Sequence, residues 1–448
     1  MRAGGDWRRR IRRFAQGRVR EWSTSAGHWG AYIGATNLVV RSAGWALNRK
    51  LPRGGGAVWC VLRRRGHTQD AQSVAAHASK QYTILPLRRR WQQAVTAAYV
   101  PCLPDHNYRS YCLQNPESYE RAIEAWQAIL ERMALRHGLS LITTGYVSYG
   151  MEQPMMEAAR RQQVPFVVIH KESVKTPADT AGWLNIFRQG TLPSAAARIL
   201  TYNEMEAGCL VEAGVARQEQ IHVCGMPRLD ALHDRRVARA GTIPPEGVLF
   251  LSFGADAGAV ARSNTDQSLW SELRQTTHEL IVRFAKDNPA VPVTIKGKSA
   301  AYDREHLETL LQEIGPKPKN LKVNFSGDGR TLFETVRVVI GFNSTALLEG
   351  MASGVPVLIP LWAEAANTKN ANNLLLFAHG ATQVPDPKSM NDAIKRHIDF
   401  PQPVSKRLDL GVEQELSHWV NNPDGRASFR AWQIMQDCLD EYRACGKS

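Results

Sequence analysis

The stretch from Val336 to Trp362 limits the fold of this chain more than any other. It opens on an apolar, β-branched run, passes through Asn343-Ser344-Thr345, and continues with apolar residues at helical spacing. Gly354 then ends the helical pattern, and a second apolar run follows. Two strands joined by a helix of about ten residues pair in parallel through a right-handed crossover. The turn at residues 343–345 is therefore expected at the carboxyl edge of a parallel sheet.

The polar side chains of this turn suit a phosphorylated ligand. Ligands of open α/β sheets bind at the carboxyl edge, and a helix start offers backbone N–H donors and a partial positive charge. The hydroxyls of Ser344 and Thr345 would add donors, and Glu349, one helical turn further on, would accept from sugar hydroxyls. The stretch thus predicts a nucleotide-sugar site. Helix capping alone would favour the same residue types, and spacing does not separate the two interpretations.

Chain length and composition narrow the class of protein. A chain of 448 residues is too long for one ordinary core and predicts two or three domains. No uninterrupted apolar stretch reaches the roughly 18 residues of a membrane span, and the N-terminus lacks the apolar core of a signal peptide. We therefore expect a cytoplasmic protein. The seven cysteines show no metal-ligand spacing, and no Asp-x-Asp motif follows a strand, so we expect neither a metal nor a cofactor.

Positive charge is concentrated at the N-terminus. Residues 1–65 hold fifteen Lys and Arg residues against two acids, Asp6 and Glu21, and so carry almost all of the formal net charge of +14. Tryptophans are interleaved with the arginines, as in amphipathic segments that lie in a lipid interface. We expect residues 1–56 to form a basic arm that holds the protein peripherally on the inner face of the cell membrane. Binding to nucleic acid is the competing interpretation and is not expected, and a solvated tail is the third.

Strand and helix patterns alternate from Ala57 onward and indicate two similar α/β halves. The first is expected at residues 57–235 and the second at 247–420. The polar residues 236–246, which include Gly241, Pro244 and Pro245, are expected to link them. The final residues, 421–448, are predicted to form a helix that packs back across the linker.

Three motifs carry a family resemblance. They are the turn Gly225-Met226-Pro227-Arg228-Leu229-Asp230 before the linker, Lys296 at the end of a strand, and residues 340–350 (IGFNSTALLEG) followed by GVPVLIP. With the two α/β halves, they resemble the GT-B glycosyltransferases of bacterial surface-polysaccharide biosynthesis. This group makes capsule and lipopolysaccharide and is related to CDP-glycerol glycerophosphotransferases. The resemblance covers residues 140–400 well and the first 110 residues poorly.

The resemblance implies two Rossmann-like domains that face each other across a cleft, and a sugar transferred from a nucleotide-activated donor. The acceptor would be a surface polysaccharide or a lipid-linked glycan held by the N-terminal domain. The donor would lie against the C-terminal domain, on a set that comprises Lys296, Asn343, Ser344, Thr345 and Glu349. Related transferases often carry Lys-Pro-His-Pro where this chain has Lys296-Gly297-Lys298-Ser299, so the phosphate contacts of that loop are not implied.

Candidate catalytic residues follow a buried strand of the first half. His170, Lys171 and Glu172 should emerge at a carboxyl edge that faces the cleft. Either His170 or Glu172 would act as general base on an acceptor hydroxyl, and Lys171 would hold a phosphate or carboxylate. Asp105 and His106 are the alternative bases, and an enzyme that retains anomeric configuration needs no such base. A solvated charged turn is the interpretation without a catalytic role.

Arg228 and Asp230 either pair structurally or place Arg228 on an acceptor or donor phosphate, and we favour the structural role. Two other functions remain open. A sugar-nucleotide 2-epimerase on the same fold would form UDP and a glycal-like intermediate, and would need acidic residues around the sugar. A non-catalytic protein that binds nucleic acid or membrane would use the basic arm alone.

Overall fold

The computed structural model describes residues 57–63, 67–78, 82–171, 173–258, 269–298, 301–326 and 329–445. The predicted basic arm lies outside the described residues, and so does the candidate base Glu172. Within the described part of the chain, no helix combines the length and apolarity needed to cross a bilayer.

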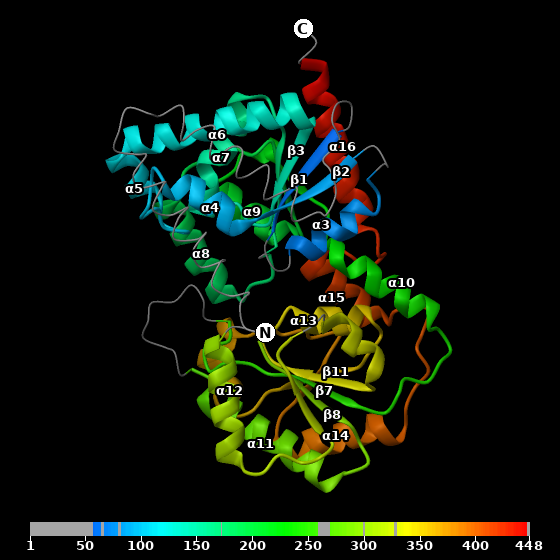
Figure 1. Ribbon diagram of the computed structural model, residues 1–448. Helices are drawn as coiled ribbons and strands as arrows, with labels where there is room; N and C mark the ends of the chain where they lie inside the picture. The colour runs from blue at the N-terminus through cyan, green and yellow to red at the C-terminus, as the bar shows by residue number, and fades with distance from the viewer. Residues whose placement is uncertain are drawn as a thin grey trace, which may run out of the picture.

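Two parallel sheets of six strands each lie one above the other, with α10 and α15 between them (Figure 1). The strand order of the N-terminal sheet is β2-β1-β3-β4-β5-β6. Its strands are β1 (Ala57–Arg63), β2 (Tyr82–Arg88), β3 (Leu139–Thr144), β4 (Phe166–Ile169), β5 (Arg198–Thr201) and β6 (Ile221–Val223). Its helices are α3 (His67–Ala75), α4 (Arg89–Ala97), α5 (Arg109–Gln114), α6 (Pro116–His137), α7 (Gln153–Arg161), α8 (Pro177–Gly190) and α9 (Glu204–Glu212).

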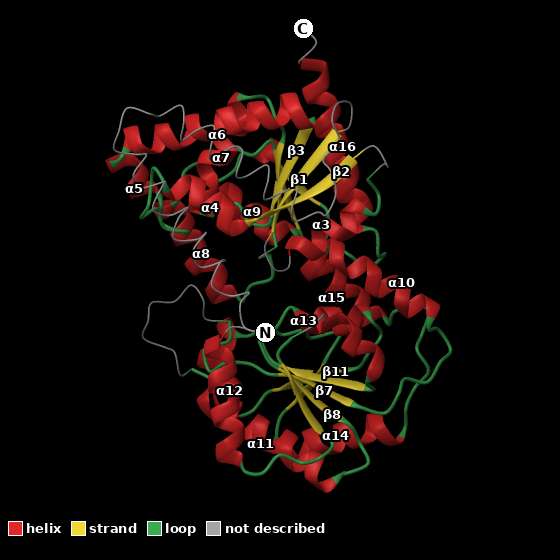
Figure 2. Cartoon of the chain, in the orientation of Figure 1, coloured by secondary structure: helices red, strands yellow, loops and turns green. Residues whose placement is uncertain are grey.

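The C-terminal sheet has the order β12-β11-β10-β7-β8-β9. Its strands are β7 (Val248–Leu251), β8 (Val293–Lys296), β9 (Leu321–Asn324), β10 (Val338–Gly341), β11 (Val357–Pro360) and β12 (Thr382–Val384). The helices around it are α11 (Ser271–Asp287), α12 (Ala301–Ile314), α13 (Ala346–Ala352) and α14 (Pro387–Asp399). Strands gather at the centre of each domain and helices lie outside them (Figure 2). The predicted α/β class with two Rossmann-like domains is confirmed.

The strand, helix, strand unit predicted from the stretch at residues 336–362 is β10, α13 and β11. β10 and β11 pair in parallel, with Val339 opposite Val357. All four residues of each strand are buried, as expected for parallel strands covered on both faces. The intervening helix has seven residues, so it is shorter than the pattern predicted.

Each sheet has a point at which the strand order reverses. In the C-terminal sheet the chain leaves β7 for β8 and β9 on one side, and then crosses to β10 on the other. In the N-terminal sheet the corresponding reversal lies between β1 and β3. Loops diverge at such a reversal and leave a crevice at the carboxyl ends of the strands, where open α/β sheets bind ligands.

The chain crosses between the sheets more than once. Helix α10 (Asp230–Ala238) leads from the first sheet to the second and contains the first residues of the predicted linker. Helices α15 (Leu410–Val420) and α16 (Ala427–Cys445) then return, and α16 packs on the N-terminal sheet beside β1 and β2 (Figure 1). Trp432 of α16 lies 6.2 Å from the ring of Trp59 and 5.6 Å from that of Tyr82.

Asp230 fastens this returning helix to the turn that ends the N-terminal domain. Its carboxylate accepts hydrogen bonds from Asn422 Nδ2 (2.9 Å), from the backbone N–H groups of Ala427 (3.1 Å) and Ser428 (2.6 Å), and from the Ser428 hydroxyl. A carboxylate at the start of a helix satisfies donors that have no partner inside the helix and complements its dipole. Asp230 is therefore an anchor for α16, and it does not pair with Arg228.

Candidate functional site

Asn343 shapes the turn at the C-terminal reversal point. Its backbone adopts a positive φ of 45°, a conformation that asparagine tolerates better than most residues. Its Nδ2 donates to the carbonyls of Ala257 (3.1 Å) and Asn373 (2.7 Å), and its Oδ1 accepts from the N–H of Leu375 (2.8 Å). These bonds tie the end of β10 to the loop after β7 and to residues 373–375. The side chain that sequence reasoning placed on the donor is thus used to hold the turn in position.

Ser344 and Thr345 lead into α13. The Ser344 hydroxyl accepts from the backbone N–H of Ala346 over 3.3 Å. Thr345 stands at the N-cap position with helical φ and ψ of −57° and −26°, and its side chain makes no capping hydrogen bond. Both residues are half-buried. The two hydroxyls therefore follow the carboxyl end of β10, which is paired with β7, and each can still hydrogen-bond to a ligand.

The backbone N–H groups at the start of α11 already have a carboxylate as partner. The carboxylate of Glu364 accepts from the backbone N–H of Glu272 (2.7 Å) and of Leu273 (2.8 Å) in the first turn of α11. The protein thus supplies its own anion where that helix begins. An incoming phosphate would have to displace Glu364 at α11, whereas in the described part of the chain no carboxylate accepts from the first backbone N–H groups of α13.

Glu349, one turn into α13, contacts the opposite domain. Its Oε1 accepts from Arg228 Nε over 3.1 Å, and the side chains of Glu349 and Arg228 are 15% and 10% exposed. Arg228 Nη1 also donates to Asp70 Oδ2 (3.1 Å) and to the hydroxyl of Tyr202 (2.6 Å). The hydroxyl of Tyr202 in turn donates to Asp70 Oδ2 over 2.6 Å. One guanidinium therefore joins helix α3, the end of β5 and helix α13.

Burial works against the charge of Arg228, but its electrostatic interactions with Tyr202, Asp70 and Glu349 outweigh it and hold its pKa well above the ordinary value. The guanidinium remains protonated, as arginine does in proteins generally. The structural role favoured for Arg228 agrees with this geometry, although its partner is not Asp230. Sequence reasoning missed Asp70 and Tyr202, because they lie 158 and 26 residues from Arg228 and belong to no motif.

Lys296 lies at the end of β8, which β7 separates from β10. Two strand spacings of about 4.8 Å put its backbone roughly 10 Å from the turn that carries Ser344. Its Nζ donates to the carbonyl of Ser326 over 3.4 Å. Beside it, a cavity of about 330 Å³ opens between the loop after β7, the loop after β8 and helix α12. Its polar and charged lining residues are Ser252, Asp256, Arg274, Lys298, Asp303 and His306.

His170 does not face the cleft. Its side chain is completely buried, Nε2 lies 2.8 Å from Glu206 Oε1, and Nδ1 accepts from the backbone N–H of Val147 over 3.3 Å. The ring also stacks on Tyr146 with a centroid separation of 4.6 Å. Both nitrogens are used inside the domain and the ring is buried, so in this structure an acceptor hydroxyl does not reach them.

Glu206 is the centre of this buried cluster. It binds His170 through one oxygen and Lys175 Nζ through the other. Burial opposes its ionisation, but the charge of Lys175 and the hydrogen bond from His170 lower the pKa of Glu206 to about 2. Glu206 thus fixes both ends of the segment that follows β4. Lys171, half-buried in that segment, donates its backbone N–H to the carbonyl of Gly145 over 3.0 Å.

The alternative bases lie in the irregular loop before α5. Asp105 forms an ion pair with Arg89. His106 Nδ1 lies 3.2 Å from the hydroxyl of Ser148, and its ring meets Trp183 edge-on at 5.1 Å. Both residues are half-buried. The structure does not bring either of them to the Ser344 turn through any described contact.

The segment after β4 nevertheless reaches the other domain. The Thr176 hydroxyl donates to the carbonyl of Gly258 over 3.5 Å, and Gly258 lies close to the Asn343 side chain. Nearby, Asn203 Nδ2 donates to the carbonyl of Trp419 over 2.6 Å. The loop that continues from the predicted acceptor residues therefore meets the loop that borders the Ser344 turn.

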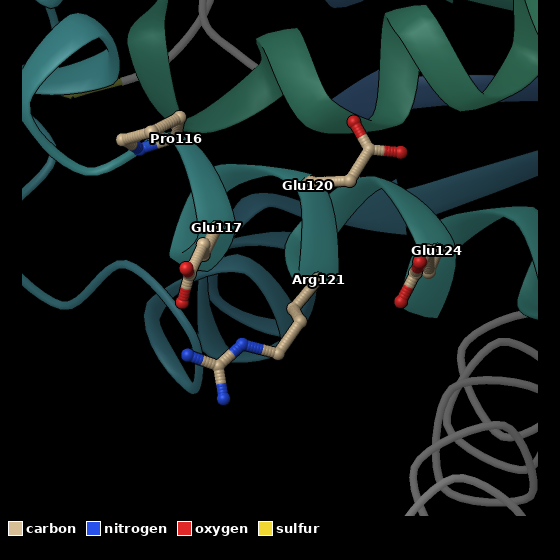
Figure 3. A pocket seen from close by; sticks show the side chains of 5 residues that line it. All are labelled: Pro116, Glu117, Glu120, Arg121 and Glu124. Atoms are coloured by element: carbon tan, nitrogen blue, oxygen red, sulfur yellow. The ribbon is translucent and has the colours of Figure 1, made fainter.

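No group of His, Cys, Asp and Glu side chains in the described part of the chain has the arrangement of a metal site. A separate hollow of about 640 Å³ lies on the exposed side of α6, lined by Pro116, Glu117, Glu120, Arg121 and Glu124 (Figure 3). Glu120 is paired with Arg161, and the hollow lies on a helix flank, away from the strand ends. It is a feature of the surface of one helix and does not belong to the candidate site.

No family model matches the chain, and no curated protein matches it in sequence. Solved structures do match the fold. A Listeria monocytogenes protein assigned as a UDP-N-acetylglucosamine 2-epimerase shares 12% identity at a TM-score of 0.51, over 87% of this chain and 98% of that one. The Methanocaldococcus jannaschii UDP-GlcNAc 2-epimerase shares 9% identity at a TM-score of 0.51, over 85% and 99%. The wall teichoic acid polymerase TagF covers 93% of this chain at 9% identity and a TM-score of 0.48.

Likeness at these identities shows the fold alone. The chain has the GT-B arrangement of two Rossmann-like domains, as the sequence motifs implied.

Proposed function

We propose that this protein is a glycosyltransferase that moves a sugar from a nucleotide-activated donor to a polysaccharide or lipid-linked acceptor. The observation that carries the proposal is the turn at Ser344 and Thr345. It lies at the reversal point of the C-terminal sheet, is held by Asn343, and is followed one helical turn later by Glu349. Hydroxyls and a helix start suit a phosphate, and a carboxylate beside them suits sugar hydroxyls.

Each residue of the donor set takes a distinct part in this proposal. Ser344 and Thr345 would donate to the phosphates, and Glu349 would accept from a hydroxyl of the ribose or sugar. Asn343 would act as a positioning residue, because its amide is committed to three backbone groups. Lys296 would contribute positive charge from the end of β8, two strands away from β10.

On the acceptor side, Glu172 stays the candidate general base and Lys171 the candidate contact for an acceptor phosphate or carboxylate. Arg228 takes no acceptor contact in this scheme, since Asp70, Tyr202 and Glu349 surround it. The acceptor classes that we propose are the capsule and lipopolysaccharide types that the family resemblance implies. The basic arm would bring the N-terminal domain to an anionic membrane that carries such acceptors.

A sugar-nucleotide 2-epimerase is the second candidate. Its support is that two matched structures with TM-scores of 0.51 bear that name. The two candidates share donor binding and differ in their need for an acceptor, since an epimerase interconverts its substrate alone.

The first experiment is a thermal-shift panel of UDP-, CDP-, GDP- and CMP-sugars on the full chain. A ligand that binds only the folded state adds about 2.7 kcal/mol of stability at 100 times its Kd, so a true donor raises Tm clearly. The member that raises Tm most is then incubated without any acceptor. An unchanged sugar supports the transferase, and conversion to its epimer supports the second candidate. A panel in which no member raises Tm contradicts both.

A further inference from the structure

Asp70 and Tyr202 have no place in the function described so far, yet they surround the guanidinium that touches Glu349. Asp70 belongs to the first turn of α3, and its side chain is fully buried. Besides Nη1, it accepts from the backbone N–H of Arg228 over 3.1 Å. Arg228 is thus held from the N-terminal domain at one side-chain nitrogen, Nη1, and at its backbone N–H.

Different nitrogens of the Arg228 guanidinium bind different partners. Nη1 is used by Asp70 and Tyr202, and Nε is used by Glu349. Because the group is planar and rigid, fixing Nη1 also fixes the direction in which Nε points. Asp70 and Tyr202 therefore determine where Glu349 meets Arg228, although neither touches Glu349.

The same arrangement leaves part of the Arg228–Glu349 pair available. Among the described residues, Glu349 Oε2 accepts no hydrogen bond and Arg228 Nη2 donates none. Glu349 Oε2 can therefore still accept a hydrogen bond, and Arg228 Nη2 can still donate one. A sugar or ribose hydroxyl both donates and accepts, so such a pair is chemically matched to vicinal hydroxyls.

We propose that Asp70 and Tyr202 are positioning residues for donor binding, which act through Arg228 to orient Glu349 toward vicinal hydroxyls of the nucleotide-sugar. This inference rests on the proposed function. Glu349 belongs to the C-terminal domain and its orienting partners belong to the N-terminal domain. The donor hydroxyls are consequently recognised in full only when the two domains stand together as they do here.

A double-mutant cycle on ligand affinity tests the inference. The variants are Asp70→Asn, Glu349→Gln and the two combined, with UDP-N-acetylglucosamine or the stronger panel member as probe and inorganic pyrophosphate as the hydroxyl-free comparison. Asp70→Asn should weaken nucleotide-sugar binding roughly tenfold in the wild-type background and less than about twofold in the Glu349→Gln background. Pyrophosphate affinity should stay unchanged in all of them.

Tyr202→Phe is a milder substitution that can replace Asp70→Asn in the same double-mutant cycle. It removes a single hydroxyl, so this variant should fold even if Asp70→Asn does not. Gln220→Ala is the matched control. Gln220 is a buried residue of the N-terminal domain that hydrogen-bonds the carbonyls of Ser194 and Ala196, remote from Arg228. Its replacement should lower Tm and leave nucleotide-sugar affinity within about twofold of wild type.

The outcomes separate this inference from the function on which it rests. If Ser344→Ala weakens binding while Asp70→Asn and Glu349→Gln act additively, the positioning role is overturned and the donor site stands. Unchanged affinity in Glu349→Gln beside a weakened Ser344→Ala likewise overturns the positioning role. If Ser344→Ala binds both probes as wild type does, the proposed donor site fails, and the inference built on it falls as well.

Discussion

Arg228 and Glu349 form an ion pair across the boundary between the two domains, with Arg228 Nε 3.1 Å from Glu349 Oε1. Arg228 ends the N-terminal domain, and Glu349 belongs to the helix that begins at the candidate phosphate site. The residue expected to be structural and the residue expected to bind ligand are thus hydrogen-bonded to each other. Domain packing and the proposed donor recognition therefore depend on one contact.

Replacing Arg228 should cost both stability and affinity. Arg228→Ala leaves the Asp70 carboxylate buried without its cation, and removal of one partner from such a pair typically costs about 3 to 5 kcal/mol. Arg228→Lys keeps the charge and loses the planar fork, so a smaller loss is expected. Urea unfolding of both variants measures the difference. Equal stability of Arg228→Ala and wild type would contradict the buried network.

Asp230 should matter for the attachment of α16. Asp230→Ala removes the acceptor of four hydrogen bonds at the start of that helix. Loss of a charged cap of this kind is expected to lower the free energy of unfolding by about 2 to 3 kcal/mol. Asp424→Ala, which removes an exposed partner of Arg430, should change it by less than about 0.5 kcal/mol. Similar losses in the two variants would show that Asp230 does not hold α16.

Glu206 should make part of the stability depend on acid pH. Its pKa falls from an ordinary 4.5 to about 2 in the folded protein. A carboxyl with a lowered folded pKa stabilises the protein above its unfolded pKa, and this contribution is lost as the pH falls toward the folded value. The Tm difference between wild type and Glu206→Gln should therefore be largest above pH 4.5 and shrink between 4.5 and 2. A difference that is constant with pH contradicts the ion pair with Lys175.

The basic arm gives a prediction that is independent of the site. Removal of residues 1–50 should abolish binding to vesicles rich in anionic lipid, because almost all of the net positive charge lies in the first 65 residues. Neutral vesicles and a DNA column serve as comparisons. Vesicle binding that survives the deletion argues against the arm as a membrane anchor, and retention on DNA alone favours the nucleic-acid interpretation.

The fold could be predicted from local patterns in the sequence. Buried parallel strands appear as continuous apolar runs such as VVIG and VLIP, and their alternation with helical spacing indicates a doubly wound sheet. The position of the Ser344 turn at a strand end followed from the same rule. The helix ends before Gly354 as predicted, where φ is +74°, and it is shorter than about ten residues because it begins only at Ala346, after the turn at residues 343–345.

The side chains of the site could be predicted only in part. A position after a strand indicates an edge of the sheet but not the direction of a side chain, so His170 was expected in the cleft and is buried on Glu206. Asn343 was expected on the ligand, and its amide instead binds three backbone groups. Asp70 and Tyr202 become visible only when the chain has folded, since no sequence spacing connects them with Arg228.

The affinity of Ser344→Ala for a nucleotide-sugar tests the central claim most directly. Loss of a hydrogen bond to a charged group costs about 1.5 to 3 kcal/mol, which corresponds to roughly a ten- to hundredfold weaker Kd. Calorimetry with UDP-N-acetylglucosamine or the stronger panel member gives that Kd, and Tm is measured on the same sample. A Kd weakened to this extent, with Tm lowered only by the loss of about 1 kcal/mol expected for a helix cap, is the predicted result. A lowered Tm with a Kd equal to that of wild type would show that Ser344 only caps its helix and would contradict the donor site.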